Sequence, residues 1–283
     1  MAESPASVSS SSSSSIGKAR PRVRELALAL GSRSRLLCAF SLLPILLISA
    51  SFSEGASAGI GPDPPGAAEI SLTPTASYSY RAKIMISTAS YQRPDPRSKR
   101  AGRLKVSAPW TGGAHTLMVL GSKNVFGQRW VNLQLGRRPN GSSAWVPASR
   151  LLISRINWRV TISLRSRVVR VFKSGRLVKR FKTVIGAPAT PTPTGQFAIY
   201  EKSRQPAPDG FIGPLALHLT AHSNVLDNFG GGPGRIAIHG RGAASLSDPL
   251  GSAASHGCLR INNSRILWLG RKLPIGTPVR IFN

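Results

Sequence analysis

Turn-forming residues divide the chain beyond Tyr80 into segments that are too short for long helices. The 283 residues include 28 Gly and 22 Pro, and the apolar residues between them often alternate with polar ones. Short alternating runs between Gly and Pro are typical of half-buried β-strands. Aromatic residues make up only 6% of the chain, which also argues against a helical bundle. The sequence therefore predicts a mainly β fold.

Two groups of predicted strands indicate two domains. In the first, residues 80–153, short β-prone runs alternate with turns such as Pro139-Asn140-Gly141, as expected of a small β-barrel. The second, residues 156–283, opens with three runs that read as successive hairpin strands, with a turn at Ser174-Gly175. The runs of the first domain are 82–87, 104–107, 117–120, 130–135 and 144–146, and those of the hairpins are 158–164, 167–173 and 176–185.

Residues 1–58 have the parts of a secretory leader. Basic residues from Lys18 to Arg35 precede the apolar run 36–52, and the small-residue site Ala56-Ser57-Ala58 follows. This order is typical of a signal peptide. The apolar run is near the lower limit of ~17 residues for a membrane span, so an uncleaved N-terminal anchor is the alternative. Residues 59–79 read as a linker, and we expect export to the cell wall or the outer side of the cell membrane.

The charge balance predicts an acidic partner. The chain carries 38 Lys and Arg against 10 Asp and Glu, a formal net charge of +28. Nucleic acid, anionic lipid and anionic wall polymers all fit that sign. No zinc-finger spacing, basic heptad helix or RNA-binding aromatic motif is present, so nucleic acid is not the predicted partner. Anionic wall polymers remain candidates, and membrane contact is expected only through the N-terminal anchor.

Cys258 is the candidate nucleophile. Cys38 lies inside the predicted leader, so a processed chain would keep Cys258 as its only thiol. Cysteine is often just a small buried residue. Here it stands in the polar turn Ser255-His256-Gly257-Cys258-Leu259-Arg260, where an imidazole and a guanidinium could activate the thiol.

His239 is the candidate base for that thiol. It ends the predicted strand 235–239 at a Gly turn, and the Gly- and Ala-rich loop that follows is long enough to return the chain beside it. A cysteine nucleophile needs such a neighbouring base. Gly240 and Gly257 would let a peptide approach the backbone, and amides near Cys258 could stabilise an oxyanion.

A zinc site is the alternative reading of these residues. His239, His256 and Cys258 could supply the three protein ligands of a catalytic zinc. Neither a CxxC nor an HExxH motif accompanies them. We therefore predict neither a metal nor another cofactor.

Residues 158–283 resemble the L,D-transpeptidase catalytic domain of the YkuD type. The resemblance rests on His239, the Ser-His-Gly-Cys motif at 255–258 and the Pro-Thr-Pro-Thr-Gly-Gln-Phe run at 191–197. It implies a β-sandwich with its active site in a cleft under a flap, for which residues 201–228 are the candidate. It also implies that the cysteine attacks the third residue of a wall tetrapeptide and expels D-alanine, and that an amine resolves the thioester into a 3-3 cross-link between stem peptides.

The resemblance assigns roles to individual residues. Cys258 is the nucleophile, and His239 is the base with its ring oriented by the Gly240 carbonyl. His256 and the amides around Gly257 form the oxyanion and acceptor side, and Ser255 supports them. Arg260 would stabilise the loop or bind a substrate carboxylate.

The first domain resembles bacterial SH3-like domains. The resemblance rests on runs such as Ala89-Ser90-Tyr91-Gln92-Arg93-Pro94 and Ala144-Trp145-Val146-Pro147. It implies a small β-barrel that binds or positions and carries no chemistry. Trp110, Trp130 and Trp145 are expected to serve packing, as aromatic residues usually do.

Two other functions are consistent with the sequence. If water resolves the thioester, the enzyme is an L,D-carboxypeptidase. If the motif is vestigial, the basic surface could make the chain a non-catalytic wall-binding protein.

Overall fold

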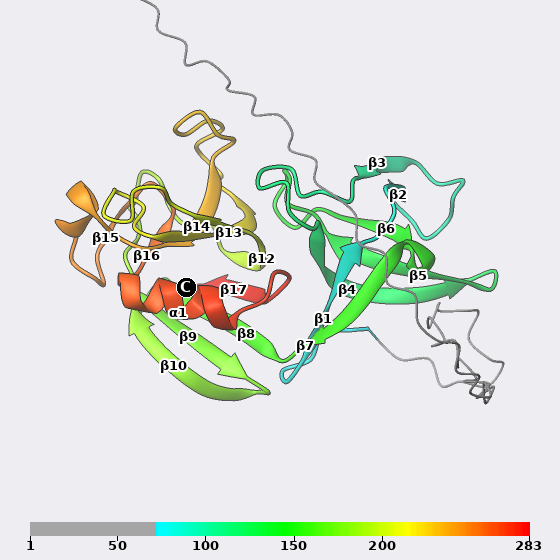
Figure 1. The fold of residues 1–283 in the computed structure, drawn as a ribbon, viewed down its shortest axis with the longest axis horizontal. Helices are drawn as coiled ribbons and strands as arrows, with labels where there is room; N and C mark the ends of the chain where they lie inside the picture. The colour runs from blue at the N-terminus through cyan, green and yellow to red at the C-terminus, as the bar shows by residue number, and fades with distance from the viewer. Residues whose placement is uncertain (1–71) are drawn as a thin grey trace, which may run out of the picture. The chain divides into compact units, whose positions relative to one another are not determined.

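The computed structural model describes residues 72–283, which belong to one compact unit. These residues are mainly β, as predicted, and they include the single α-helix α1 (Asn263–Lys272) (Figure 1). The predicted leader, and the predicted linker up to residue 71, lie outside the described residues. Within residues 72–283, no helix is long and apolar enough to cross a membrane.

The first sheet has seven strands, and we call residues 79–156 the N-terminal lobe. Its strand order is β3-β2-β6-β5-β4-β1-β7. Leu117, Val131 and Leu133 are buried in its core. The strands are β1 (Ser79–Ile84), β2 (Thr88–Tyr91), β3 (Arg100–Leu104), β4 (Thr116–Val125), β5 (Gln128–Gln134), β6 (Ser143–Pro147) and β7 (Leu151–Ile156).

Five of these strands overlap the five predicted runs, whereas β2 and β7 do not. β7 pairs along its whole length with β1, over 60 residues earlier in the chain. Such a long-range pairing leaves no local sequence signal. That this lobe is an SH3-like barrel stays a prediction.

The second sheet has eight strands, and we call residues 158–283 the C-terminal lobe. Its order is β10-β9-β8-β17-β12-β13-β14-β16, and a separate pair is formed by β11 and β15. Helix α1 packs its buried Ile266 and Leu269 against the core. The strands are β8 (Trp158–Ser163), β9 (Val168–Lys173), β10 (Arg176–Lys182), β11 (Ile185–Gly186), β12 (Gly195–Arg204), β13 (Leu215–His222), β14 (Arg235–His239), β15 (Ala253–Ser255), β16 (Leu259–Arg260) and β17 (Pro278–Phe282).

The predicted hairpin strands are confirmed as β8, β9 and β10, which pair in antiparallel order. The flap predicted at 201–228 is wrong as a single irregular segment. β12 and β13 pair across it, and only the connections 205–214 and 223–234 are irregular. The prolines at 206, 208 and 214 fall within one connection, so they do not interrupt the alternating strand that follows.

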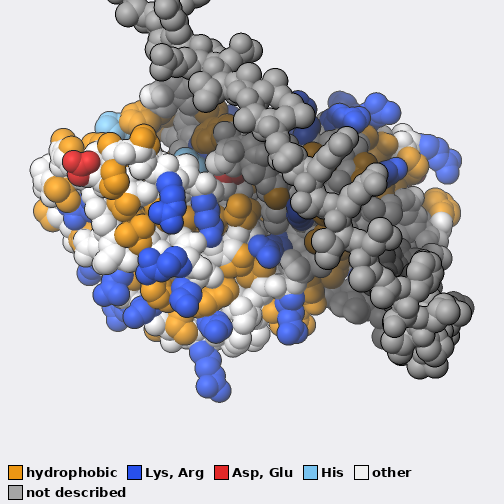
Figure 2. Space-filling model, in the orientation of Figure 1, with side chains coloured by type: hydrophobic (Ala, Val, Ile, Leu, Met, Phe, Trp, Pro, Cys, Tyr) orange, Lys and Arg blue, Asp and Glu red, His pale blue; other side chains and the backbone are white. Residues whose placement is uncertain are grey.

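On the face shown in Figure 2, basic side chains of the described residues are spread widely and acidic ones are few. Strand β10 is an example, because Arg176, Lys179, Arg180 and Lys182 are all exposed. Adjacent charges of one sign give this strand a positive surface potential.

We expect Leu217→Ala to lower the free energy of unfolding by about 2–5 kcal/mol, because it empties a core position in β13 that is 0% exposed. Leu177→Ala is the matched control, since Leu177 lies on β10 and is 52% exposed. That substitution should alter the free energy of unfolding by no more than about 0.5 kcal/mol. Urea unfolding measures both, and equal effects would contradict this core assignment.

Candidate active site

Cys258 and His239 are brought together by two paired strands. β14 and β16 run parallel, with Ile238 opposite Leu259 and His239 opposite Arg260. Cys258 immediately precedes β16, so it lies beside β14, and its Sγ is 4.0 Å from the carbonyl oxygen of Arg235. Cys258 and His239 both line one cavity of about 310 Å³.

The His239 ring is buried and oriented by backbone carbonyls. Its Nδ1 lies 2.8 Å from the Gly240 oxygen and 3.3 Å from the Ile212 oxygen. Because carbonyl oxygens only accept hydrogen bonds, Nδ1 carries the hydrogen and Nε2 keeps a free lone pair. Burial lowers the pKa of His239 to about 4, although the Gly240 carbonyl acts in the opposite direction. The ring is therefore neutral at pH 7 and able to accept a proton.

The turn after His239 is fixed by the first residue of α1. Asn263 accepts a hydrogen bond from the Arg241 amide at 2.7 Å and donates one to the Arg241 carbonyl at 2.9 Å. A Cβ on Gly240 would lie 2.4 Å from Asn263 Oδ1, so only Gly fits there without rearrangement. Helix α1 thereby sets the position of the carbonyl that orients His239.

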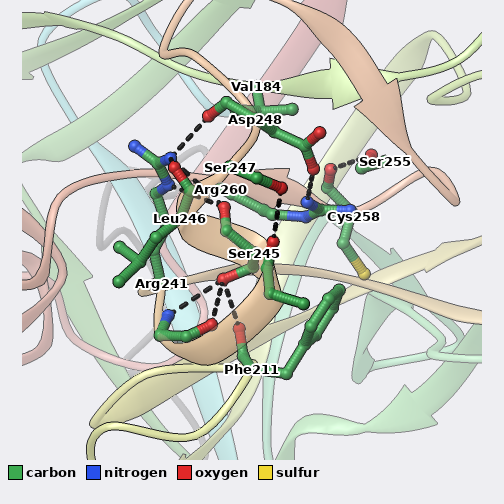
Figure 3. Close-up of polar contacts among 12 residues, drawn as sticks. Val184, Phe211, Arg241, Ser245, Leu246, Ser247, Asp248, Ser255, Cys258 and Arg260 are labelled. Atoms are coloured by element: carbon green, nitrogen blue, oxygen red, sulfur yellow. Dashed lines mark hydrogen bonds and ion pairs between the residues drawn. The ribbon is translucent and has the colours of Figure 1, made fainter.

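The turn 255–258 is closed by the Ser255 hydroxyl. Ser255 is buried, and its Oγ donates to the Cys258 carbonyl oxygen at 2.5 Å (Figure 3). The Gly257 amide donates to the same Oγ at 3.1 Å. Gly257 has φ 111°, a conformation that favours glycine. Ser255 and Gly257 thus set the direction of the Cys258 side chain.

The Pro-Thr run at 190–194 stabilises the turn 255–258 through side-chain hydrogen bonds. Thr192 Oγ accepts from the Gly186 amide at 2.9 Å and donates to the Gly257 carbonyl at 2.8 Å. Thr190 Oγ donates to the Ser255 carbonyl at 3.1 Å. Thr192 is 4% exposed, so this part of the run is buried. Its hydroxyl replaces the ladder bonds that the prolines cannot make.

Burial raises the pKa of the Cys258 thiol above its ordinary value. A hydrogen bond with the Ala237 backbone and the charge of Arg260 act in the opposite direction, but they are smaller. The thiol is therefore protonated at neutral pH, and a nucleophilic role would require it to lose that proton.

Arg260 is held by the loop that connects β14 to β15. It is 3% exposed, and its guanidinium pairs with Asp248. In the same loop, the Arg241 guanidinium donates to the carbonyl oxygens of Leu246 at 2.8 Å and Asp248 at 2.5 Å (Figure 3). This geometry favours the loop-stabilising alternative for Arg260 over direct substrate binding.

His256 lies at the exposed rim of the cavity. Its ring is 4.9 Å from that of Phe229, which belongs to the connection 223–234. Both side chains line the cavity together with Cys258. Phe229, one residue beyond the predicted flap 201–228, thus places the connection 223–234 against the turn 255–258.

Two cavity residues were not recognised as such from the sequence. Arg235 begins β14 and lines the cavity, and Trp110 of the N-terminal lobe lines it as well. Side-chain alternation along β14 places Arg235 on the same face as His239, a signal that could have identified it. Trp110 was expected to serve packing only, and no local pattern connects it to β14.

Within residues 72–283, no group of three or more His, Cys, Asp and Glu side chains is placed to hold a metal ion. The zinc alternative for His239, His256 and Cys258 is therefore not formed in the described part of the chain.

Comparison with known proteins gives the class of this fold and site. The L,D-transpeptidase catalytic domain (YkuD) matches residues 157–281. The YkuD protein of Bacillus licheniformis is 34% identical over 146 residues, which cover 52% of this chain and 78% of that protein. The YkuD protein of Bacillus subtilis is 27% identical over 126 residues, 44% of this chain and 66% of that protein. The chain belongs to the YkuD family of L,D-transpeptidase domains.

Solved structures of L,D-transpeptidases are also similar. L,D-transpeptidase 3 of Mycobacterium tuberculosis, in complex with a faropenem-derived adduct, is 15% identical with a TM-score of 0.36, covering 55% of this chain and 91% of that one. A mutant L,D-transpeptidase of Enterococcus faecium is 21% identical with a TM-score of 0.33, covering 44% of this chain. The match spans 49% of the enterococcal chain, about half its length.

We expect the protein to lose stability as the pH falls from about 6.5 towards 4. Burial lowers the pKa of His218, His222 and His239 to about 4, so in this range the unfolded chain binds protons that the folded chain does not. Stability is therefore present above the ordinary histidine pKa and is lost below it. Urea unfolding at several pH values measures the slope of the free energy of unfolding against pH.

His218→Gln should make this loss shallower, because it removes one of the three groups. Ser247→Ala is the matched control, since that exposed hydroxyl does not titrate in this pH range. A slope that is identical in both variants would refute the assignment.

Proposed function

We propose that this chain is a peptidoglycan L,D-transpeptidase that forms 3-3 cross-links through a Cys258 thioester. The observation that carries the proposal is the pairing of β14 with β16, which sets a carbonyl-oriented imidazole and a thiol on the wall of one cavity. A nucleophile, a base and a third group that orients the base are the parts that covalent acyl transfer requires. Family membership supports a peptidoglycan-modifying enzyme.

In the first half-reaction the Cys258 sulfur attacks the carbonyl carbon of the third residue of a donor stem. His239 Nε2 takes the thiol proton as the sulfur–carbon bond forms. The bond to the D-alanine nitrogen then breaks, and His239 returns the proton to that leaving amine. The Gly240 carbonyl, 2.8 Å from Nδ1, stabilises the imidazolium that exists between these steps.

The oxyanion that forms in this step has to be stabilised by a backbone amide that does not already donate a hydrogen bond within the turn. The Gly257 amide already donates to Ser255 Oγ, so we assign the role to the Cys258 amide, with His256 at the rim on the acceptor side. Ser255, Gly257 and Arg260 position the turn. In the second half-reaction an acceptor amine attacks the thioester, the new carbon–nitrogen bond forms, and the sulfur leaves as the thiolate and regains a proton.

The remaining proposals concern the rest of the chain. Residues 1–58 would direct export, with or without cleavage, and residues 80–153 would form an SH3-like positioning domain. The catalytic domain would occupy residues 156–283. The basic surface, β10 included, would hold the enzyme against anionic wall polymers.

Cys258→Ala should abolish cross-link formation between purified tetrapeptide stems, because residues 72–283 contain no other thiol that could form the thioester. Ser247→Ala is the control, since that hydroxyl is exposed and bonds only to the Ala244 carbonyl. Chromatography of the products with mass detection separates cross-linked dimers from tripeptides. Tripeptides alone would indicate an L,D-carboxypeptidase, and full activity of Cys258→Ala would refute the mechanism.

A carbapenem should add one acyl group to the intact protein, on Cys258, because a strained lactam carbonyl is a substitute for the stem carbonyl. Intact mass spectrometry followed by peptide mapping locates the adduct. If no adduct forms and wall material is still bound by Cys258→Ala, the chain is a non-catalytic wall-binding protein.

A further inference from the structure

The cavity beside Cys258 has a wall that the N-terminal lobe helps to build. Trp110, from the connection between β3 and β4, lines the cavity and is 44% exposed. Its ring centroid lies 3.5 Å from the guanidinium carbon of Arg235. The next residue, Thr111, donates its amide to Glu201 Oε2 at 2.7 Å. The position of Trp110 is therefore fixed by contacts with β12 and β14.

Arg235 has hydrogen-bond donors that nothing in the described chain accepts. Its side chain is 5% exposed, and Nε and Nη1 are buried without a partner. Glu201 Oε1 forms an ion pair with Nη1 at 3.8 Å, too far for a hydrogen bond, and neither atom has a hydrogen-bond partner in the described chain. Charged donors that are buried without a hydrogen-bond acceptor carry a large desolvation cost. A ligand with an anionic group would offset that cost.

Arg235 stands next to the reacting atoms. It shares a strand face with His239, and its carbonyl oxygen is 4.0 Å from Cys258 Sγ. Arg260, which also lines the cavity, pairs with Asp248. The surrounding wall includes the apolar side chains of Phe211, Ile212, Leu226 and Phe229. Arg235 is thus the cation best placed to select a charged group within a mostly apolar cavity.

We propose that Arg235, held by Trp110 of the N-terminal lobe, binds a carboxylate of the donor stem peptide. This inference rests on the proposed function. Two carboxylates of a stem could lie within reach: that of the terminal D-alanine, and one carried by the side chain of the third residue. Stacking of the guanidinium on Trp110 leaves its N–H edge for the planar oxygens of a carboxylate. The N-terminal lobe would thereby contribute to substrate selection.

The test compares three donor tetrapeptides: one with both carboxylates free, one amidated on the side chain of the third residue, and one amidated at D-alanine. For the wild-type chain, kcat/KM should fall at least about tenfold with one of the amides, as expected for loss of a charged hydrogen bond. The amide that shows the fall identifies the carboxylate. Equal kcat/KM for all three donors would overturn the proposal.

The variants separate recognition from chemistry. The double variant Arg235→Gln with Glu201→Gln leaves neither charge unpaired, and it should lose the preference while iodoacetamide still alkylates Cys258 at the wild-type rate. Trp110→Ala should weaken the preference, whereas Phe126→Ala, at an N-terminal-lobe residue that is 90% exposed, should keep it. Retention of the full preference by the double variant would overturn the assignment to Arg235.

Failure of the underlying function gives a different result. If iodoacetamide alkylates Cys258 but none of the three donors is converted, the proposed transpeptidase function fails, and the carboxylate assignment fails with it. If donors are converted without discrimination, only the assignment to Arg235 fails.

Discussion

The site depends on the parallel pairing of β14 with β16, which is only two residues long. Two ladder positions cannot hold a strand in register alone, so neighbouring bonds must supply the rest. Val184 and Arg260 exchange both backbone bonds, at 2.9 and 3.1 Å. Thr192 and Ser255 fix the turn that precedes Cys258. A one-residue slip of β16 would turn Cys258 to the opposite face of the sheet, away from His239. The Pro-Thr run and the turn 255–258 therefore form one structural unit, although over 50 residues separate them.

Three arginines with buried side chains surround this unit, and the chain gives each of them different partners. Arg241 donates to carbonyl oxygens of its own loop. Arg260 pairs with Asp248 in that loop. Arg235 is stacked between the rings of Trp110 and Tyr200, with Glu201 beyond hydrogen-bond distance. The guanidinium groups of Arg241 and Arg260 thus stabilise the conformation of the loop between β14 and β15. Aromatic faces attract a cation without accepting its N–H groups in line, so the third charge keeps its capacity for a ligand.

The parts of this structure that the sequence predicts are those with local causes. Alternation predicts β8 to β10, and a strand that ends at His239-Gly240 followed by Ser255–Cys258 predicts that His239 and Cys258 come together. The role of Thr192 depends on carbonyls far along the chain, and Trp110 reaches Arg235 from the other lobe. Neither contact is indicated by a hydrophobic period or a motif in the sequence. The pairing of β12 with β13 is not predicted for a different reason. The prolines of the connection 205–214 are typical of an irregular segment, although the strands on either side of them form an ordinary antiparallel pair.

Burial also affects how readily the Cys258 thiol is oxidised. The thiolate is the form that oxidants and disulfides attack, and its fraction is set by the thiol pKa. Burial raises that pKa in Cys258 and lowers that of His239 to about 4, so both groups are neutral at pH 7. In the proposed reaction the proton would therefore move when a carbonyl carbon is already within reach of the sulfur, and Nε2 would take it. The apolar lining of the cavity keeps the thiol protonated and therefore weakly nucleophilic. In an exported enzyme the same lining would protect the thiol from oxidation, and its reactivity would depend on the bound stem peptide.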